Sequence, residues 1–167
     1  NDFMYNLSYW SSWSNGFNIW KSEFDKIDKN LKLNKLFPHT SLFLTQHQAK
    51  LFCINDNLLF DVQRIPKRGG HNKFEAFTIE YPSLLDECCK KGHISTKCKK
   101  HILFGIMVQF LPSLLFNKYI IRIETFDDTG FRNNLKKYYP SYAYWLVLIS
   151  VLGVPFRLFC RKLKNKR

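Results

Sequence analysis

The sequence predicts an α+β fold, with a small antiparallel sheet, flanking helices and a C-terminal membrane helix. Three observations lead to this prediction. Short apolar runs separated by turn residues fill residues 41–81, as in a meander of strands. An amphipathic segment precedes them at residues 18–36. The stretch 142–160 is uncharged over residues 143–156 and leads into a basic tail. This order is typical of a helix that anchors a protein in a membrane.

Composition and charge limit the class of protein. The chain has 167 residues, of which 46% are hydrophobic and 17% aromatic, and this excludes a disordered chain. Residues 101–167 contain eleven basic and three acidic side chains, whereas residues 1–60 contain six and five. Such a positive field suits anionic lipid headgroups or nucleic-acid phosphates. The five cysteines are odd in number and include an adjacent pair, which favours a reducing compartment over a disulfide framework.

The chain divides into an expected α+β domain over residues 1–130 and a membrane helix with its tail over residues 131–167. No internal repeat is evident. The apolar residues of the first amphipathic segment, residues 18–36, recur at spacings of four, three and four: Trp20, Phe24, Ile27 and Leu31. This spacing predicts a helix that packs on its own domain.

The predicted sheet contains four apolar runs, at residues 41–45, 49–54, 57–65 and 73–81. A further strand is expected at residues 119–126, before the turn Asp127-Asp128-Thr129-Gly130. A glycine-containing basic loop with Lys67 and Arg68 precedes the fourth run. Glycines there would expose backbone N–H groups beside two cations. Lys67 and Arg68 are therefore candidate contacts for anionic lipid or phosphate.

Residues 82–101 form a segment rich in cysteine and lysine, with metal-ligand spacing. Four residues separate Cys88 from His93, and four more separate His93 from Cys98. These eleven residues, with their Gly-His-Ile core, resemble the latter part of a retroviral-type zinc knuckle. The resemblance implies zinc as cofactor and RNA as partner.

The segment departs from the knuckle at one ligand, because Leu85 stands where the first cysteine would fall. Zinc needs four ligands in a closed structural site, so His101 or Cys89 would have to supply the fourth. The candidate metal site is Cys88, His93, Cys98 and His101. The alternative is a basic loop with free thiols.

Residues 102–116 form a second apolar run. As a helix its fifteen residues measure about 22 Å, which is shorter than the ~30 Å hydrocarbon core of a bilayer. Gln109 and Pro112 interrupt it. Two interpretations stay open: a buried or interfacial helix, or a second membrane span.

The predicted membrane helix, residues 142–160, begins with aromatic residues and ends with basic ones. Its candidate membrane-facing residues are Tyr142, Trp145, Leu146, Leu148, Leu152 and Phe156. Its candidate contacts for anionic lipid or phosphate are Arg157, Arg161, Lys162 and Lys164. The span reaches the expected length of ~20 residues only if Arg157 snorkels to the surface. So short a span favours packing against other helices.

No motif of a known catalytic site is present, neither a nucleophile elbow, a P-loop, a dinucleotide fingerprint nor a His-Glu-x-x-His sequence. We therefore expect a non-enzymatic interaction protein, anchored in an organelle membrane or endomembrane as an accessory subunit of a complex. Its partners would be membrane lipid and other protein subunits, with nucleic acid as an alternative, and the sequence identifies no small-molecule substrate. One alternative is a basic ribonucleoprotein component that uses the knuckle-like segment. Another is a membrane-bound enzyme of unknown reaction.

Overall fold

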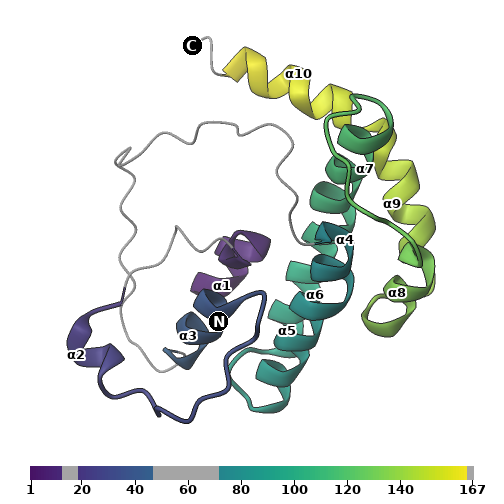
Figure 1. The fold of residues 1–167 in the computed structure, drawn as a ribbon. Coiled ribbons are helices and arrows are strands. Elements are labelled where there is room, and N and C mark those ends of the chain that lie inside the picture. Colours follow the sequence, from purple (N-terminus) through teal and green to yellow (C-terminus); the bar gives the residue numbers. More distant parts are fainter. Residues whose placement is uncertain (13–18, 47–71, 165–167) are drawn as a thin grey trace.

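The computed structural model of the chain describes residues 1–12, 19–46 and 72–164, with side chains up to residue 160. These residues form helices and irregular segments, and they contain no strand. The predicted α+β fold with an antiparallel sheet is therefore wrong. The architecture is an antiparallel helical hairpin covered on two sides by shorter helices (Figure 1).

The elements fall into three groups along the chain. The N-terminal group comprises α1 (Asp2–Leu7), the 3₁₀ helix η1 (Ser8–Ser12), α2 (Lys21–Phe24) and α3 (Pro38–Thr45). The central group comprises α4 (Lys73–Glu75), η3 (Ala76–Glu80), α5 (Tyr81–Lys90), α6 (Thr96–Gly105), η4 (Ile106–Phe110) and α7 (Leu111–Tyr119). The C-terminal group comprises α8 (Phe131–Tyr138), α9 (Ala143–Leu152) and α10 (Val154–Lys164).

The central group is the hairpin, and its corner has clear local signals. Gly92 adopts a left-handed φ of 75°, and the N–H of His93 donates to the carbonyl of Cys88 at 2.9 Å, as in a glycine-terminated helix. The Ser95 side chain then accepts from the N–H of Cys98 and caps α6. The predicted cysteine-rich segment is thus the end of one helix and the start of the next.

An acidic side chain joins the two arms beside the corner. The carboxylate of Asp86 on α5 lies 2.9 Å from Lys90 on the same helix and 2.8 Å from Lys99 on α6. Hydrogen bonds from Lys99 and then Lys90 lower the pKa of Asp86. This ion pair fixes the register of the hairpin near its closed end.

Both arms contain the same proline-interrupted element. In each arm a five-residue π-helical turn, η3 or η4, leads directly into an apolar residue followed by Pro-Ser-Leu-Leu. Pro82 and Pro112 are both fully buried. Proline lacks an N–H, and its ring clashes with the carbonyl four residues earlier. The wider π turn accommodates that clash without ending the helix. The match is too short to stand out as a repeat in the sequence.

The first π turn leaves a backbone carbonyl without its helical partner. The N–H of Tyr81 donates to the carbonyl of Ala76 rather than to that of Phe77, and the next residue, Pro82, has no N–H to donate. The buried hydroxyl of Tyr139 donates instead to the Phe77 carbonyl, at 2.6 Å. The segment that follows α8 is therefore fastened to the interior of the hairpin.

The two outer groups cover different parts of the hairpin. In the N-terminal group, α1 and η1 pack on α6, and α3 packs on η1. In the C-terminal group, α8 packs on η3, while α9 packs on η4 and α7. The buried residues of the 131–152 segment belong to the same core as the hairpin: Phe131, Leu135, Tyr139, Ala143 and Val147.

Close packing of the N-terminal group requires a glycine in α6. A Cβ at Gly105 would lie 3.0 Å from Ser8 Oγ and 3.2 Å from the ring of Tyr9. The same contact region is tied together by polar groups, because Thr40 Oγ1 donates to the carbonyl of Ser11 at 2.8 Å. Ser11 Oγ in turn bonds to the hydroxyl of the fully buried Tyr81.

Two of the expected strands lie in helices. Residues 73–81 form the beginning of the first arm of the hairpin, and residues 41–45 belong to α3. In the first case Phe74, Phe77 and Tyr81 are buried at the spacing of a helix and not of a strand. The expected strand 119–126 is the end of α7 followed by irregular chain.

The remaining expectations had mixed outcomes. The runs 49–54 and 57–65 lie outside the described residues. The expected helix 18–36 is reduced to α2, whose flanking Trp20 is 82% exposed. A longer helix does not form because this segment buries no apolar face, and short helices without such packing are unstable in water. The helix expected at residues 102–116 is present, within the longer arm Thr96–Tyr119.

The bond from Tyr139 gives a stability prediction. Tyr139→Phe leaves the buried Phe77 carbonyl unpaired, which should lower the free energy of unfolding by about 1–3 kcal/mol. Denaturant midpoints measured in one buffer or detergent would show this change. Tyr138→Phe is the matched control, since Tyr138 is half-buried, and it should shift the unfolding free energy by less than about 0.5 kcal/mol. Equal effects of the two changes would contradict the assigned bond.

Candidate membrane-binding face

Six large apolar side chains form a line along the outside of α9 and α10. They recur at spacings of three, four, three, four and three, and each is between 58 and 80% exposed: Tyr142, Trp145, Ile149, Leu152, Phe156 and Phe159. We call this line the apolar stripe. Since residues three and four apart share a helix face, these side chains form one surface.

The opposite face of α9 is apolar as well. Ala143 and Val147 are 1% and 0% exposed and pack into the core. The helix contains no charged residue, and Ser150 is its one uncharged polar side chain apart from Tyr144 and Trp145. A helix that is apolar on every face belongs to a large core or to a membrane. Here the core covers only the inner face.

The helices α9 and α10 meet at a bend of 49°. Gly153 donates its N–H to the carbonyl of Ser150 in a tighter turn, and Pro155 has no N–H for the carbonyl four residues before it. Both features are recognised causes of helix kinks. The stretch expected as one continuous membrane helix, residues 142–160, is thus a bent pair.

By length and composition, one or two segments of the described chain could cross a membrane. The arm Thr96–Tyr119 has a mean hydropathy of 1.3 over its most apolar window, of which 50% is buried inside the protein. The bent pair α9–α10 is the second, if it is counted as one broken span. Core helices of soluble proteins can have the same length and hydropathy.

Arg157 points from α10 toward the hairpin. Its Nη1 donates to the backbone carbonyl of Val108 in η4. In an unbroken α-helix that carbonyl would pair with the N–H of residue 112, which is proline. Nη2 is buried and has no partner among the described residues. The structure thus places this candidate lipid contact against the core.

Tyr9 and Gln109 lie beside this arginine and complete a small polar group. The hydroxyl of Tyr9 donates to Gln109 Oε1 at 3.2 Å. Burial raises the pKa of Tyr9, and the charge of Arg157 acts in the opposite direction. The group joins the N-terminal segment, the second arm of the hairpin and α10.

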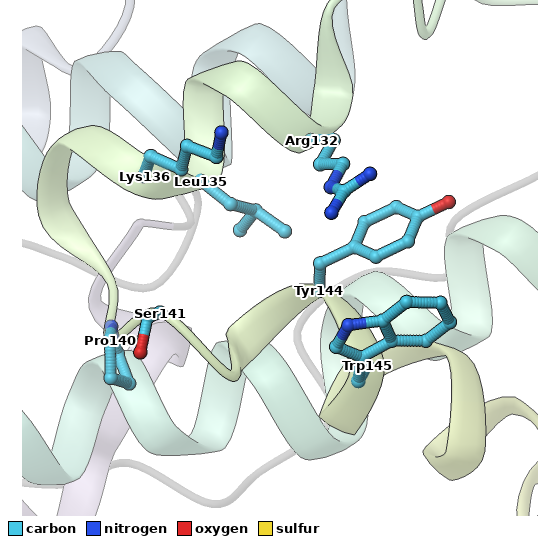
Figure 2. Close-up of a pocket in the computed structure, with 7 residues that line it drawn as sticks. All are labelled: Arg132, Leu135, Lys136, Pro140, Ser141, Tyr144 and Trp145. Carbon is cyan, nitrogen blue, oxygen red and sulfur yellow. The ribbon is translucent and has the colours of Figure 1, made fainter.

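A small pocket opens between α8 and the start of α9 (Figure 2). It has a volume of about 40 Å³. Its lining includes Arg132, Leu135 and Lys136 of α8, the linking Ser141, and Tyr144 and Trp145 of α9. The Arg132 guanidinium lies 5.3 Å from the centre of the Tyr144 ring, in a cation–π contact.

A wider groove adjoins the pocket on the far side of Arg132 and Tyr144. It has a volume of about 420 Å³, and its apolar wall includes Leu115, Phe131 and Leu148. Asp128 also borders the groove, but its carboxylate already accepts hydrogen bonds from Lys118 and Tyr119. The pocket and groove together form a surface region with cationic and aromatic side chains beside the apolar stripe.

The candidate zinc ligands have other contacts. The thiol of Cys98 lies 3.8 Å from the carbonyl of Asn1, and the ring of His101 stacks on Tyr5 with centroids 3.8 Å apart. Cys88 is buried, and His93 lies in the turn between the arms. In the part of the chain that the structure describes, no three histidine, cysteine, aspartate or glutamate side chains lie close enough together to hold a metal ion. The geometry thus gives no support to zinc here.

Sequence reasoning found some of the residues in this region and missed others. The candidates Lys67 and Arg68 lie outside the described residues. Arg161, Lys162 and Lys164 belong to α10, but their side chains are not described. The pocket residues Arg132 and Lys136 were missed, although their spacing of four on a helical segment was a usable signal.

Comparison with protein-family models, curated proteins and solved structures finds no significant match to this chain.

The bond from Arg157 predicts that α10 loosens when this side chain is removed. Arg157→Leu should speed amide hydrogen exchange in α10 about ten-fold or more, because a lost hydrogen bond to a charged group costs about 1.5–3 kcal/mol. Exchange resolved by peptide and mass spectrometry would measure it. Phe159→Leu, which changes a 60% exposed residue on the same helix, should leave exchange in solution unchanged. Unaltered α10 exchange in Arg157→Leu would rule out this anchoring role.

Burial raises the pKa of the Cys88 thiol to about 11, with the charge of Glu87 adding to the effect. At pH 8 only about 0.1% of this thiol is ionised, so a maleimide should label it at least ten-fold more slowly than the half-buried Cys89. The Cys88 rate should rise about ten-fold per pH unit below pH 11, because the thiolate is the reacting form. Peptide mapping after timed labelling would measure both rates, and denaturant should abolish the difference. Equal labelling of the folded protein at pH 8 would contradict the assigned burial.

Proposed function

We propose that this chain is a membrane-attached subunit that acts by binding, with α9 and α10 lying along a bilayer surface. The apolar stripe would be immersed in one leaflet. The stripe is also the observation that supports the proposal most directly, since six large apolar side chains are at least 58% exposed in one line. Monomeric soluble proteins rarely leave so continuous an apolar surface in water.

A partner helix is the main competitor for the stripe, because spacings of three and four also mark a coiled-coil seam. Two features favour lipid. Coiled coils place charged residues beside the seam, whereas α9 contains none. A seam also needs a smoothly continuous helix, and the 49° bend at Gly153 interrupts this one.

The lengths and charges favour helices that lie in the membrane surface. The ten residues of α9 measure about 15 Å, half of the ~30 Å hydrocarbon core. If α9 entered the bilayer upright, the basic α10 would follow it to the bilayer centre, where charges are costly. An apolar face next to a basic helix is typical of in-plane attachment.

A second exposed apolar segment supports a role within an assembly. It lies at the end of α7 and just beyond it, and its residues are between 49 and 62% exposed: Tyr119, Ile120, Ile121 and Ile123. These side chains are separate in sequence from the stripe. A contact with another protein subunit would cover them, in keeping with an accessory subunit of a membrane-associated complex.

The proposal predicts that charges on the stripe release the protein from membranes. Leu152→Glu combined with Phe156→Glu changes residues that are 80% and 70% exposed, so folding should be retained. Each lost apolar contact costs about 1.5–3 kcal/mol, and vesicle binding measured by flotation should fall at least 100-fold. Circular dichroism would verify the fold.

The matched control changes two exposed apolar residues away from the stripe. Trp20→Glu combined with Phe24→Glu alters residues that are 82% and 49% exposed, and it should leave vesicle binding within about two-fold of wild type, since neither residue lies on the stripe. Membrane fractions give a second test. Wild type should resist high salt and need detergent for release. Release by salt alone would reject the proposal and favour a nucleic-acid or peripheral electrostatic role.

A further inference from the structure

The pocket between α8 and α9 contains two cations without acidic partners. Arg132 and Lys136 are four residues apart on α8 and therefore lie on the same face. No ion pair of the described residues involves either of them. Ser141, in the turn before α9, also lines the pocket. Two unpaired cations beside one small space can bind an anion.

The surrounding sequence strengthens the preference for an anion. Residues 129–167 contain nine basic side chains and no acidic one. Asp128 is the acid that borders the neighbouring groove. Although burial acts in the opposite direction, hydrogen bonds from Lys118 and Tyr119 hold the pKa of Asp128 below its ordinary value. This carboxylate is therefore already occupied as a hydrogen-bond acceptor and leaves Arg132 available.

The pocket lies where the apolar stripe begins. Trp145 belongs to the stripe and also lines the pocket, and Leu148 lines the adjoining groove. Figure 2 shows the rings of Tyr144 and Trp145 opposite the α8 side chains. Tyrosine and tryptophan favour the headgroup level of a bilayer. A cationic pocket at this point would face lipid headgroups when the stripe lies in the hydrocarbon.

The dimensions fit a phosphate group with an attached hydrocarbon chain. A pocket of about 40 Å³ has room for about three water molecules, and so for the oxygens of one phosphate but not for a nucleobase. The groove beside it, of about 420 Å³, has an apolar wall that includes Leu115, Phe131 and Leu148. A polar cavity that opens directly onto an apolar groove matches the two ends of a phospholipid.

We propose that the pocket between α8 and α9 binds the phosphate of an anionic phospholipid, with Arg132 and Lys136 as the contacting cations. The lipid's hydrocarbon would continue along the groove and the stripe. This inference rests on the proposed membrane attachment, and it specifies the lipid partner. A free phosphate or an RNA phosphate offers the same anion, but neither would use the apolar wall.

The test measures how well the protein discriminates between vesicles of phosphatidylcholine alone and vesicles that also contain phosphatidylglycerol. Wild type should bind the anionic vesicles at least ten-fold more tightly, since each basic residue near an anionic surface contributes about 1 kcal/mol. Arg132→Gln combined with Lys136→Gln should remove most of this preference and leave binding to neutral vesicles unchanged.

The matched control removes the same charge from outside the pocket. Lys35→Gln combined with Lys137→Gln alters two exposed lysines, one of them on α8, and should retain most of the preference for anionic vesicles. The exchange Arg132→Lys with Lys136→Arg preserves both charges and should restore binding, which separates a charge effect from a folding defect. Circular dichroism of each variant would verify the fold.

The outcomes separate this inference from the proposed function. Failure of wild type to bind either kind of vesicle would reject membrane attachment itself. Equal binding to both kinds would leave attachment intact and overturn the phosphate site, as would equal losses in the pocket and control variants. Pocket-dependent binding of inorganic phosphate without any preference for anionic vesicles, or pocket-dependent binding of single-stranded RNA without vesicle binding, would assign the pocket to a different phosphate.

Discussion

The backbone carbonyls that the two prolines leave unpaired determine how the rest of the chain is arranged. A buried carbonyl needs a hydrogen-bond donor, and Pro82 and Pro112 each interrupt the ladder of a buried helix. Tyr139 supplies the donor for the Phe77 carbonyl, and Arg157 supplies one for the Val108 carbonyl. Both donors come from the C-terminal helices. The unpaired carbonyls of the hairpin therefore bind the end of α8 and the first half of α10 to it.

The inward direction of Arg157 has a consequence for the surface. An arginine at this place in α10 would interrupt an apolar face if it pointed outward. Because its guanidinium is bonded to the hairpin, its neighbours Phe156 and Phe159 share an outer face without a charge between them. The same bond thus fastens α10 and keeps the stripe continuous.

The helix at residues 102–116 was predicted despite Pro112, because its apolar run is long, whereas the shorter run that ends before Pro82 was interpreted as a strand. Residues 73–81 resemble a strand because Pro82 looks like the end of an element. Their helix continues because the π turn accommodates Pro82, and Tyr139, 62 residues away, donates a hydrogen bond to the Phe77 carbonyl that the proline leaves unpaired. A hydrogen-bond donor so distant in sequence cannot be inferred from the pattern of neighbouring residues. The knuckle-like spacing of Cys88 and Cys98 is also local, and in the structure Cys88 lies near the end of α5 and Cys98 in the first turn of α6, with the corner of the hairpin between them.

The exposure of the stripe follows from the way α9 packs on the hairpin. The inner face of α9 presents the small residues Ala143 and Val147 to the hairpin, at 1% and 0% exposure. Rotating α9 to hide Leu152 would force larger side chains into that closely packed contact, and overpacking of this kind is destabilising. The described helices therefore cannot cover the stripe by a rotation of α9. Among possible coverings, a bilayer accommodates the bend at Gly153 more readily than a straight partner helix does.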